Sequence, residues 1–235
     1  MQWDSSKYFK KTLKTKIMDC TCPSTGILTQ IPSANCPFDL KQIQRIAFGT
    51  RGIVLWDSAT GNGAADGTPL PMKDAQLDTK ADWTIATTAT DNSLLVITPL
   101  IGGEPKIEAG EAITEGGGDN TTLNGVELTV GTNPSKFSTK FNSLSPEQEK
   151  AIKAISCEEV EVYFFTQDGS IIASKPDAAK ENVRGFIADS FYFSDRNNEG
   201  FGTKDFFTMS FSLRAGWSEK LVKVKAIDFN PLYDI

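Results

Sequence analysis

The pattern that most constrains this chain is the alternation of apolar and polar residues between Asp205 and Leu213. Its apolar members are Phe207, Met209, Phe211 and Leu213, and its polar members are Thr208, Ser210 and Ser212. A period of two residues places these two sets on opposite faces of a β-strand, with the apolar face toward a core. Similar alternation recurs in the segments 126–130, 136–141, 159–165 and 221–227. The sequence therefore predicts a fold built mainly from strands.

Further signals place turns and shorter elements around this pattern. Asp168-Gly169 separates the segment 159–165 from Ile171-Ile172, which is a strong hairpin signal. The sequence also predicts strands at 53–56, 94–97 and 184–194, and a short helix within 76–90 around Trp83. Residues 38–48 fit either a helix or a strand. The scattered tryptophans are expected to anchor a core or an interface, and they are Trp3, Trp56, Trp83 and Trp217.

The best helix signal in the chain spans residues 145–156. Its start is marked by Ser145 as N-cap, Pro146 at the first helical position, Gln148 as the capping-box partner, and Glu147 and Glu149 in the first turn. An apolar stripe then follows at helical spacing, formed by Ala151, Ile152 and Ile155. We expect this stripe to pack against a β-sheet.

These elements indicate an α+β fold that is mainly β. The 235 residues suit one large domain and contain no repeat of solenoid or propeller type. We expect an antiparallel β-sandwich or partial barrel with one main flanking helix at 145–156. Residues 38–235 would form this single domain, with a long exposed loop at 58–72 that is rich in Gly and Pro. Residues 1–37 lack sustained periodicity and would form an extended N-terminal arm.

The sequence shows no recognisable catalytic centre. The chain has no histidine, which removes the commonest general base and the commonest metal ligand. No Ser-x-x-Lys motif stands out in a strand-to-helix context. Glu158, Glu159 and Glu161 are clustered, but Glu159 and Glu161 fall on one face of a predicted strand and are expected to meet solvent. We therefore predict no catalytic residue, no cofactor and no enzymatic activity.

Two other motifs suggest ligand sites at first. The glycine triplet at 116–118 could cradle a phosphate, but no Gly-Lys-Ser or Gly-Lys-Thr follows it, so a hairpin or an assembly loop is expected. Cys20, Cys22 and Cys36 lie near one end and could hold zinc, with Cys157 as a fourth ligand. Their C-x-C spacing and the missing histidine favour ordinary reduced cysteines. No metal site is therefore predicted.

The charge of the chain limits its partners. The net charge is −6 and the pI is about 4.9, so the chain is a poor binder of nucleic acid, because that affinity depends on cationic side chains that neutralise phosphates. Such a chain could still form a wall along which DNA slides. The lysines at 7–16 make a basic end that could touch an acidic surface or could be a solvated, frayed terminus. Without a secretory signal or a membrane-spanning run, we expect folding in a cytoplasm and no membrane anchor.

Several segments of the sequence resemble segments of structural proteins from tailed bacteriophages that infect Bacteroidetes-type bacteria. These segments are residues 36–48, Val96-Ile-Thr-Pro-Leu100, residues 110–120 and Leu123-Asn-Gly-Val126. The order of strands around one helix at 145–156 is also similar to the plan of major tail-tube proteins. That resemblance implies that six copies close into a ring, that rings stack into a tube, and that an arm or a long loop reaches the neighbouring ring.

The resemblance further implies a virion component that folds in the cytoplasm of its bacterial host. Its expected partners are other copies of the chain, tape-measure or neck proteins, and DNA in transient, non-specific passage through a negatively charged bore. The arm at 1–37 and the loop at 58–72 are the expected contacts between rings, whereas the Gly-rich stretch at 102–126 has no assigned role. A capsid-decoration, neck or other head–tail structural protein is the alternative. An enzyme would need a pocket built without histidine, and a carbohydrate-binding sandwich would be expected to carry a signal peptide.

Overall fold

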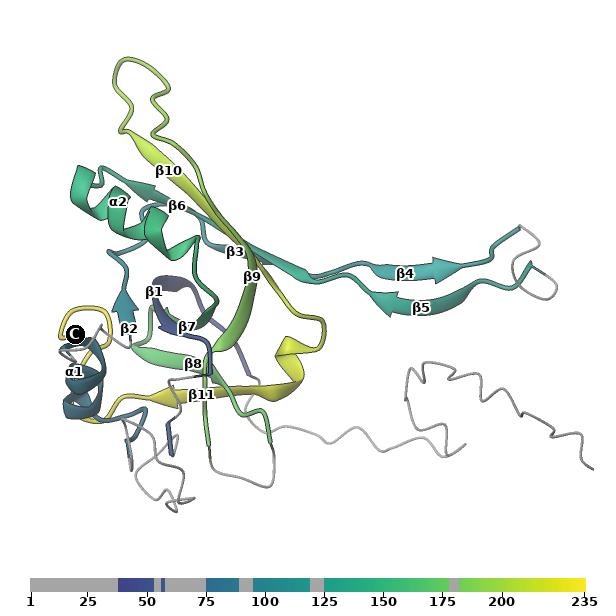
Figure 1. The fold of residues 1–235 in the computed structure, drawn as a ribbon, viewed down its shortest axis with the longest axis horizontal. Helices are drawn as coiled ribbons and strands as arrows, with labels where there is room; N and C mark the ends of the chain where they lie inside the picture. The colour runs from purple at the N-terminus through teal and green to yellow at the C-terminus, as the bar shows by residue number, and fades with distance from the viewer. Residues whose placement is uncertain (1–37, 53–55, 58–74, 89–94, 119–124, 178–181) are drawn as a thin grey trace, which may run out of the picture. The chain divides into compact units, whose positions relative to one another are not determined.

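The computed structural model describes residues 38–52, 56–57, 75–88, 95–118, 125–177 and 182–235 (Figure 1). The strands are β1 (Ile43–Thr50), β2 (Leu95–Ile97), β3 (Lys106–Glu108), β4 (Ala112–Glu115), β5 (Leu128–Thr132), β6 (Ser135–Asn142), β7 (Val160–Thr166), β8 (Ser170–Ser174), β9 (Phe186–Phe193), β10 (Phe206–Leu213) and β11 (Leu221–Lys225). The helices are α1 (Lys80–Thr88), α2 (Pro146–Ile155) and the 3-10 turn η2 (Trp217–Lys220). Strands dominate this part of the chain, which confirms the predicted mainly β class. The predicted arm at 1–37 and the loop at 58–72 lie outside the described residues.

Nine of the strands form one sheet. Hydrogen-bonded neighbours follow the order β11-β8-β7-β9-β10-β6-β3, and β1 pairs with both β7 and β2. The pairings within this sheet are antiparallel, as predicted. The sheet branches at β7, because one edge of β7 is shared by β8 and β9 while the other edge pairs with β1. The strands β4 and β5 form a separate two-stranded sheet.

Strand β7 is the centre of the fold and is buried along its whole length. Val162 and Phe164 enter one apolar core, whereas Tyr163 and Phe165 enter a second core. A period of two residues sends neighbouring side chains to opposite faces of a strand, so this one strand separates the two cores. The alternation at 159–165 predicted the strand, but it did not reveal that both faces are covered.

The first core is built largely by β6 and β10. Phe137 lies directly opposite Phe211 in the antiparallel ladder, and their rings stack with centroids 4.8 Å apart. The apolar side chains of β10 are all buried, and they are Phe207, Met209, Phe211 and Leu213. The intervening polar residues of β10 are only partly buried. Both predicted faces of this strand are therefore confirmed, and each cross-strand aromatic pair adds about 0.5–1.5 kcal/mol beyond its area burial.

Helix α2 begins with the predicted capping box. The backbone N–H of Gln148 donates to Ser145 Oγ at 3.2 Å, and the backbone N–H of Ser145 donates to Gln148 Oε1 at 3.0 Å. Ile152 and Ile155 are buried in the first core, which confirms that the helix packs on the sheet. Ala151 was predicted to share this stripe, but it is exposed. The apolar stripe that packs on the sheet is narrower than predicted. The sheet covers Ile152 and Ile155, which lie three residues apart, and leaves Ala151 in solvent.

The second core is organised around tryptophans. Trp83 of α1 is fully buried, and its indole N–H donates to the carbonyl of Leu77 at 2.8 Å. The rings of Trp56 and Trp83 are 4.7 Å apart, and Tyr163 meets both of them edge-on. The predicted short helix around Trp83 and the anchoring roles of these two tryptophans are confirmed. Trp3 lies outside the described residues.

The segment 38–48, which fitted either a helix or a strand, continues into strand β1. The Arg45 side chain of this strand donates to the carbonyl oxygens of Leu232 at 3.0 Å and Ile235 at 2.6 Å. It also donates to the carbonyl of Thr98 at 2.7 Å. One side chain therefore ties the C-terminal segment to the sheet, which nothing in the local sequence indicated.

The remaining predicted elements fall close to their expected places. The segments 94–97, 184–194 and 221–227 form β2, β9 and β11. Of the predicted strand at 53–56 only Trp56 is described, and it forms an isolated bridge with Val183. The Asp168-Gly169 turn joins β7 to β8, as predicted, and Gly169 has a φ of +74° that favours glycine.

The chain divides into two compact units. Residues 38–113 and 132–235 form one unit, and residues 114–131 belong to the other. The second unit therefore contains the distal part of the β4–β5 hairpin. The division into an arm at 1–37 and one domain at 38–235 stays a prediction.

Candidate assembly surfaces

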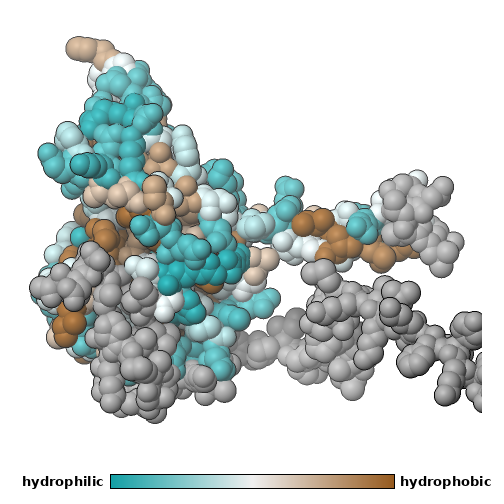
Figure 2. Space-filling model, in the orientation of Figure 1, coloured by the Kyte–Doolittle hydropathy of each residue, from teal (hydrophilic) through white to brown (hydrophobic). Residues whose placement is uncertain are grey.

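The first candidate surface is the hairpin formed by β4 and β5. Every residue of β4 is exposed, and so is most of β5. Ile113 and Leu128 are 43% and 53% exposed, and Val126 and Val130 are also exposed apolar residues. Figure 2 shows this apolar surface as brown patches along the hairpin. An isolated two-stranded hairpin is only marginally stable in water, so the exposed apolar side chains make this hairpin a candidate assembly surface.

Glycine residues allow the backbone conformation of this hairpin. Residues 116–118 have φ angles of +95°, +81° and +118°, a region that L side chains rarely adopt. The N–H of Gly117 donates to the carbonyl of Gly125 at 3.2 Å, so the triplet pairs with the returning side of the hairpin. Nearer the base, a Cβ at Gly110 would lie 1.7 Å from the carbonyl oxygen of Asn133. The expectation of a hairpin at the glycine triplet is confirmed, and the Gly-rich stretch acquires a structural role.

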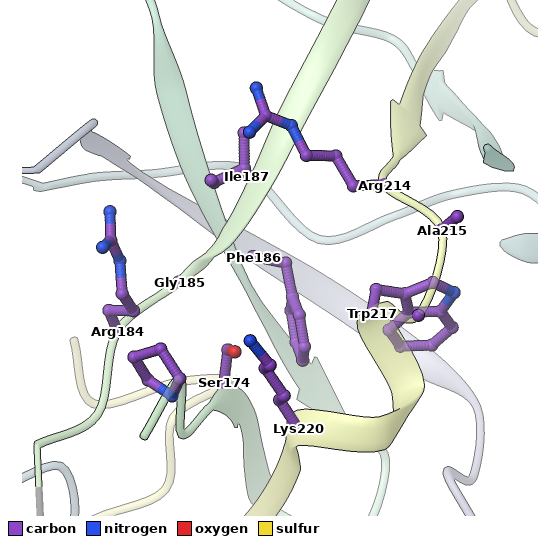
Figure 3. Close-up of a pocket in the computed structure, with 11 residues that line it drawn as sticks. Ser174, Arg184, Gly185, Phe186, Ile187, Arg214, Ala215, Trp217 and Lys220 are labelled. Carbon is purple, nitrogen blue, oxygen red and sulfur yellow. The ribbon is translucent and has the colours of Figure 1, made fainter. Parts of the chain in front are cut away.

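The second candidate surface is a hollow of about 280 Å³ beside β8, β9 and η2 (Figure 3). Its principal lining residues are Ser174, Arg184, Phe186, Arg214, Trp217 and Lys220. Phe186 and Trp217 make an apolar wall, with their rings edge-on at 5.4 Å. In Figure 3 the Lys220 side chain reaches toward Ser174 and the Phe186 ring. The hollow thus combines an apolar wall with three cationic side chains and has no carboxylate in its lining.

Two of these cations pair with acidic residues that do not line the hollow. Arg184 pairs with Glu161, whose side chain is 1% exposed. This hydrogen bond raises the pKa of Arg184, while partial burial opposes the shift. Arg214 pairs with Asp189 at 2.7 Å, which lowers the pKa of Asp189 and raises the pKa of Arg214. These pairs fix both guanidinium groups in place around the hollow.

The prediction that Glu159 and Glu161 both meet solvent is wrong for Glu161. The side chain of Glu159 is 80% exposed and pairs with Arg51 at 3.0 Å. Glu161 is fully buried, because it shares a face of β7 with Tyr163 and that face belongs to the second core. Arg184, from a distant segment, donates to Oε1 of this buried carboxylate, whereas Oε2 has no hydrogen-bond partner within the described residues. Local sequence pattern shows which residues share a face, but it does not show whether another layer covers that face.

The other residues considered for ligand chemistry do not come together in the described chain. Cys157 is a free, exposed thiol, and Cys20, Cys22 and Cys36 lie outside the described residues. Within the described ranges, no group of three or more Cys, Asp or Glu side chains is placed to hold a metal ion. Neither α-helix of the described chain is long and apolar enough to span a bilayer.

The sequence predicted a hairpin or an assembly loop at the glycine triplet, but it indicated neither the exposed apolar face of that hairpin nor the hollow. Arg184, Arg214 and Lys220 come from three separate segments, so their convergence left no local motif. The hairpin did leave a signal, since its apolar residues at 126–130 alternate with polar ones. That alternation was interpreted as a strand with a buried face, whereas the structure leaves both β4 and β5 largely in solvent.

The class of fold defined by these features is a large antiparallel sheet with two helices and an exposed, apolar hairpin. The sequence matches no family model. It also matches no curated protein. Among solved structures, a chain from the tail of an empty gene transfer agent particle, determined with helical refinement and C6 symmetry, is 10% identical with a TM-score of 0.30. That match covers 49% of this chain and 80% of the other.

A second similar structure is a chain from the virion of a native gene transfer agent particle. It is 11% identical with a TM-score of 0.30, and the match covers 53% of this chain and 87% of the other. Both similarities are distant.

Proposed function

We propose that this chain is a structural subunit of a phage-like virion, which assembles with copies of itself into stacked rings that form a tail tube for DNA. The observation that carries this proposal is the exposed apolar hairpin of β4 and β5. Ile113 and Leu128 present apolar surface on an element that has no core of its own. Such an element reaches full stability only when a partner covers it.

The simplest partner for this hairpin is another copy of the same chain, because that assembly needs no second protein. Most soluble assemblies are symmetric homo-oligomers, and a contact between two different surfaces closes into a ring when the rotation between copies permits it. The resemblance of the sequence to tail-tube proteins supports six copies per ring. The arm at 1–37 and the loop at 58–72 are proposed to make contacts between rings, alongside the hairpin.

The charge of the chain is consistent with a conduit for DNA. A net charge of −6 disfavours tight binding to phosphates, so DNA would pass through a negatively charged bore without being retained. Tape-measure and neck proteins are the proposed partners at the inside and at the end of such a tube. The subunit would fold in the cytoplasm of the bacterial host before it enters the virion.

The proposal is tested by electron microscopy and sedimentation of the purified full-length chain. We expect rings or tubes from the wild type, and folded monomers from a double variant carrying Ile113→Ser and Leu128→Ser. The matched control is Thr129→Ser, which alters an exposed polar residue of the same hairpin and should leave assembly unchanged.

Two outcomes would contradict the proposal. A wild-type chain that stays monomeric at high concentration would show that the hairpin does not drive self-assembly. A chain that coats or caps a shell in particles, rather than lining a tail, would favour the decoration or neck alternative.

A further inference from the structure

The hollow beside η2 carries an unbalanced positive charge. Arg184 and Arg214 have acidic partners, but no acid lies within ion-pair distance of Lys220 in the described part of the chain. Trp217 is half-buried and supplies an apolar wall next to these cations. The hollow therefore suits a segment that presents a carboxylate beside an apolar side chain.

The β4–β5 hairpin has the complementary composition. Residues 107–135 contain no Lys or Arg, and their acids are Glu108, Glu111, Glu115, Asp119 and Glu127. Ile113 and Glu115 lie two residues apart on β4, so they project from the same face of that strand. Both residues are exposed. The hairpin thus offers an apolar group and a carboxylate side by side.

We infer that the hollow lined by Arg214, Trp217 and Lys220 binds the β4–β5 hairpin of another copy of this chain. The carboxylate of Glu115 would lie at Lys220 and Arg214, and the side chain of Ile113 would pack against Trp217. This inference rests on the proposed function and names the surface that receives the hairpin. The contact joins two different surfaces of successive copies, which is the arrangement that generates rings or stacks.

A second copy fits the hollow better than nucleic acid does. The hollow has a volume of about 280 Å³ and an apolar wall, so it accommodates one or two side chains rather than a phosphate backbone. A phosphate backbone is bound through many cations along its length, whereas this chain has an excess of acidic residues. Charge complementarity between an acidic hairpin and a cationic hollow also sets the register of the two copies.

A charge exchange tests the contact directly. Lys220→Glu alone and Glu115→Lys alone should each raise the protein concentration needed for assembly by about tenfold or more, because each places like charges together. The double variant with both changes restores an opposite-charge pair, and it should assemble near the wild-type concentration. Lys150→Glu, an exposed change of the same kind on α2, is the matched control and should have no effect. Circular dichroism and thermal melting establish that each variant is folded.

The outcomes separate this contact from the proposed function. Wild-type assembly with equal assembly of Lys220→Glu would overturn the contact and leave the tube proposal standing. A wild type that never assembles would contradict both. Nucleic acid is the competing ligand, and fluorescence anisotropy with a labelled DNA duplex tests whether the hollow binds it. If the wild type bound the duplex and Lys220→Glu did not, the inference would be overturned in favour of a phosphate site.

Discussion

The guanidinium group of Arg184 holds the carboxylate of Glu161, and the side chain of Glu161 is only 1% exposed. The pair links β7 to the segment just before β9, and the backbone N–H of Gly52 donates to the same carboxylate at 3.2 Å. Gly185 leaves the space for this arrangement, since a Cβ at that position would lie 2.7 Å from the Cβ of Glu161. A buried charge of this kind depends on its partner, because an unpaired carboxylate in a core is costly.

Replacing Arg184 by methionine should therefore destabilise the subunit. Arg184→Met removes the partner of a buried carboxylate, and we expect the free energy of unfolding to fall by about 3–5 kcal/mol. Urea denaturation followed by circular dichroism measures this change. Arg214→Met is the matched control, because its pair with Asp189 is about half exposed, and it should cost less than about 1 kcal/mol. If Arg184→Met and Arg214→Met lowered the free energy of unfolding equally, the burial of Glu161 would have no energetic consequence.

The packing of α2 on the sheet gives a second prediction. Ile152→Asp places an unpaired charge in the first core, where the native side chain is 4% exposed, so the free energy of unfolding should fall by about 3 kcal/mol or more. Ala151→Asp changes the neighbouring exposed position and should shift stability by less than about 0.5 kcal/mol. Differential scanning calorimetry of both variants provides the comparison. A melting temperature unchanged by Ile152→Asp would mean that the stripe does not pack on the sheet.

The turn between β7 and β8 should make stability depend on pH. Burial raises the pKa of Asp168, but hydrogen bonds from Lys223, Thr166 and Ser170 outweigh it, and the net pKa lies below the ordinary value. The contribution of this carboxylate to folding is therefore complete above the ordinary pKa of about 3.9 and is lost as the pH falls below it toward the folded-state pKa.

Asp168→Asn isolates this contribution. The wild type should be more stable than the variant at about pH 6, and the gap between them should narrow at about pH 3, where the unfolded carboxylate is protonated. Urea denaturation at the two pH values measures the gap. A difference in the free energy of unfolding that stays constant with pH would contradict the assigned role of the carboxylate.

The N-terminal arm gives a prediction at the level of assembly. Deletion of residues 1–19 should leave a folded subunit that does not polymerise, because the arm is proposed to contact the neighbouring ring. Circular dichroism tests the fold, and electron microscopy tests the polymer. Normal tubes from the truncated chain would show that the arm has no role between rings.

Several features of this fold were predictable from local sequence, because their causes are local. The alternation in β10 identified its buried face, since a strand has a period of two residues. The capping box at Ser145 and Gln148 identified the start of α2, because both partners lie within one helical turn. The Asp168-Gly169 turn likewise predicted the β7–β8 hairpin from the conformational freedom of one glycine.

Only the tertiary structure decided how far each face is covered and which distant residues meet. Glu161 is buried and Ala151 is exposed, because burial depends on the layer that packs against an element and not on the element alone. Arg184, Arg214 and Lys220 converge because β9, β10 and η2 place them around one hollow, although Arg184 and Lys220 lie 36 positions apart in the sequence. Sequence thus determined the periodicity, the caps and the turns, which are short-range properties of the backbone. The long-range pairing of strands decided the cores, the buried ion pair and the candidate assembly surfaces.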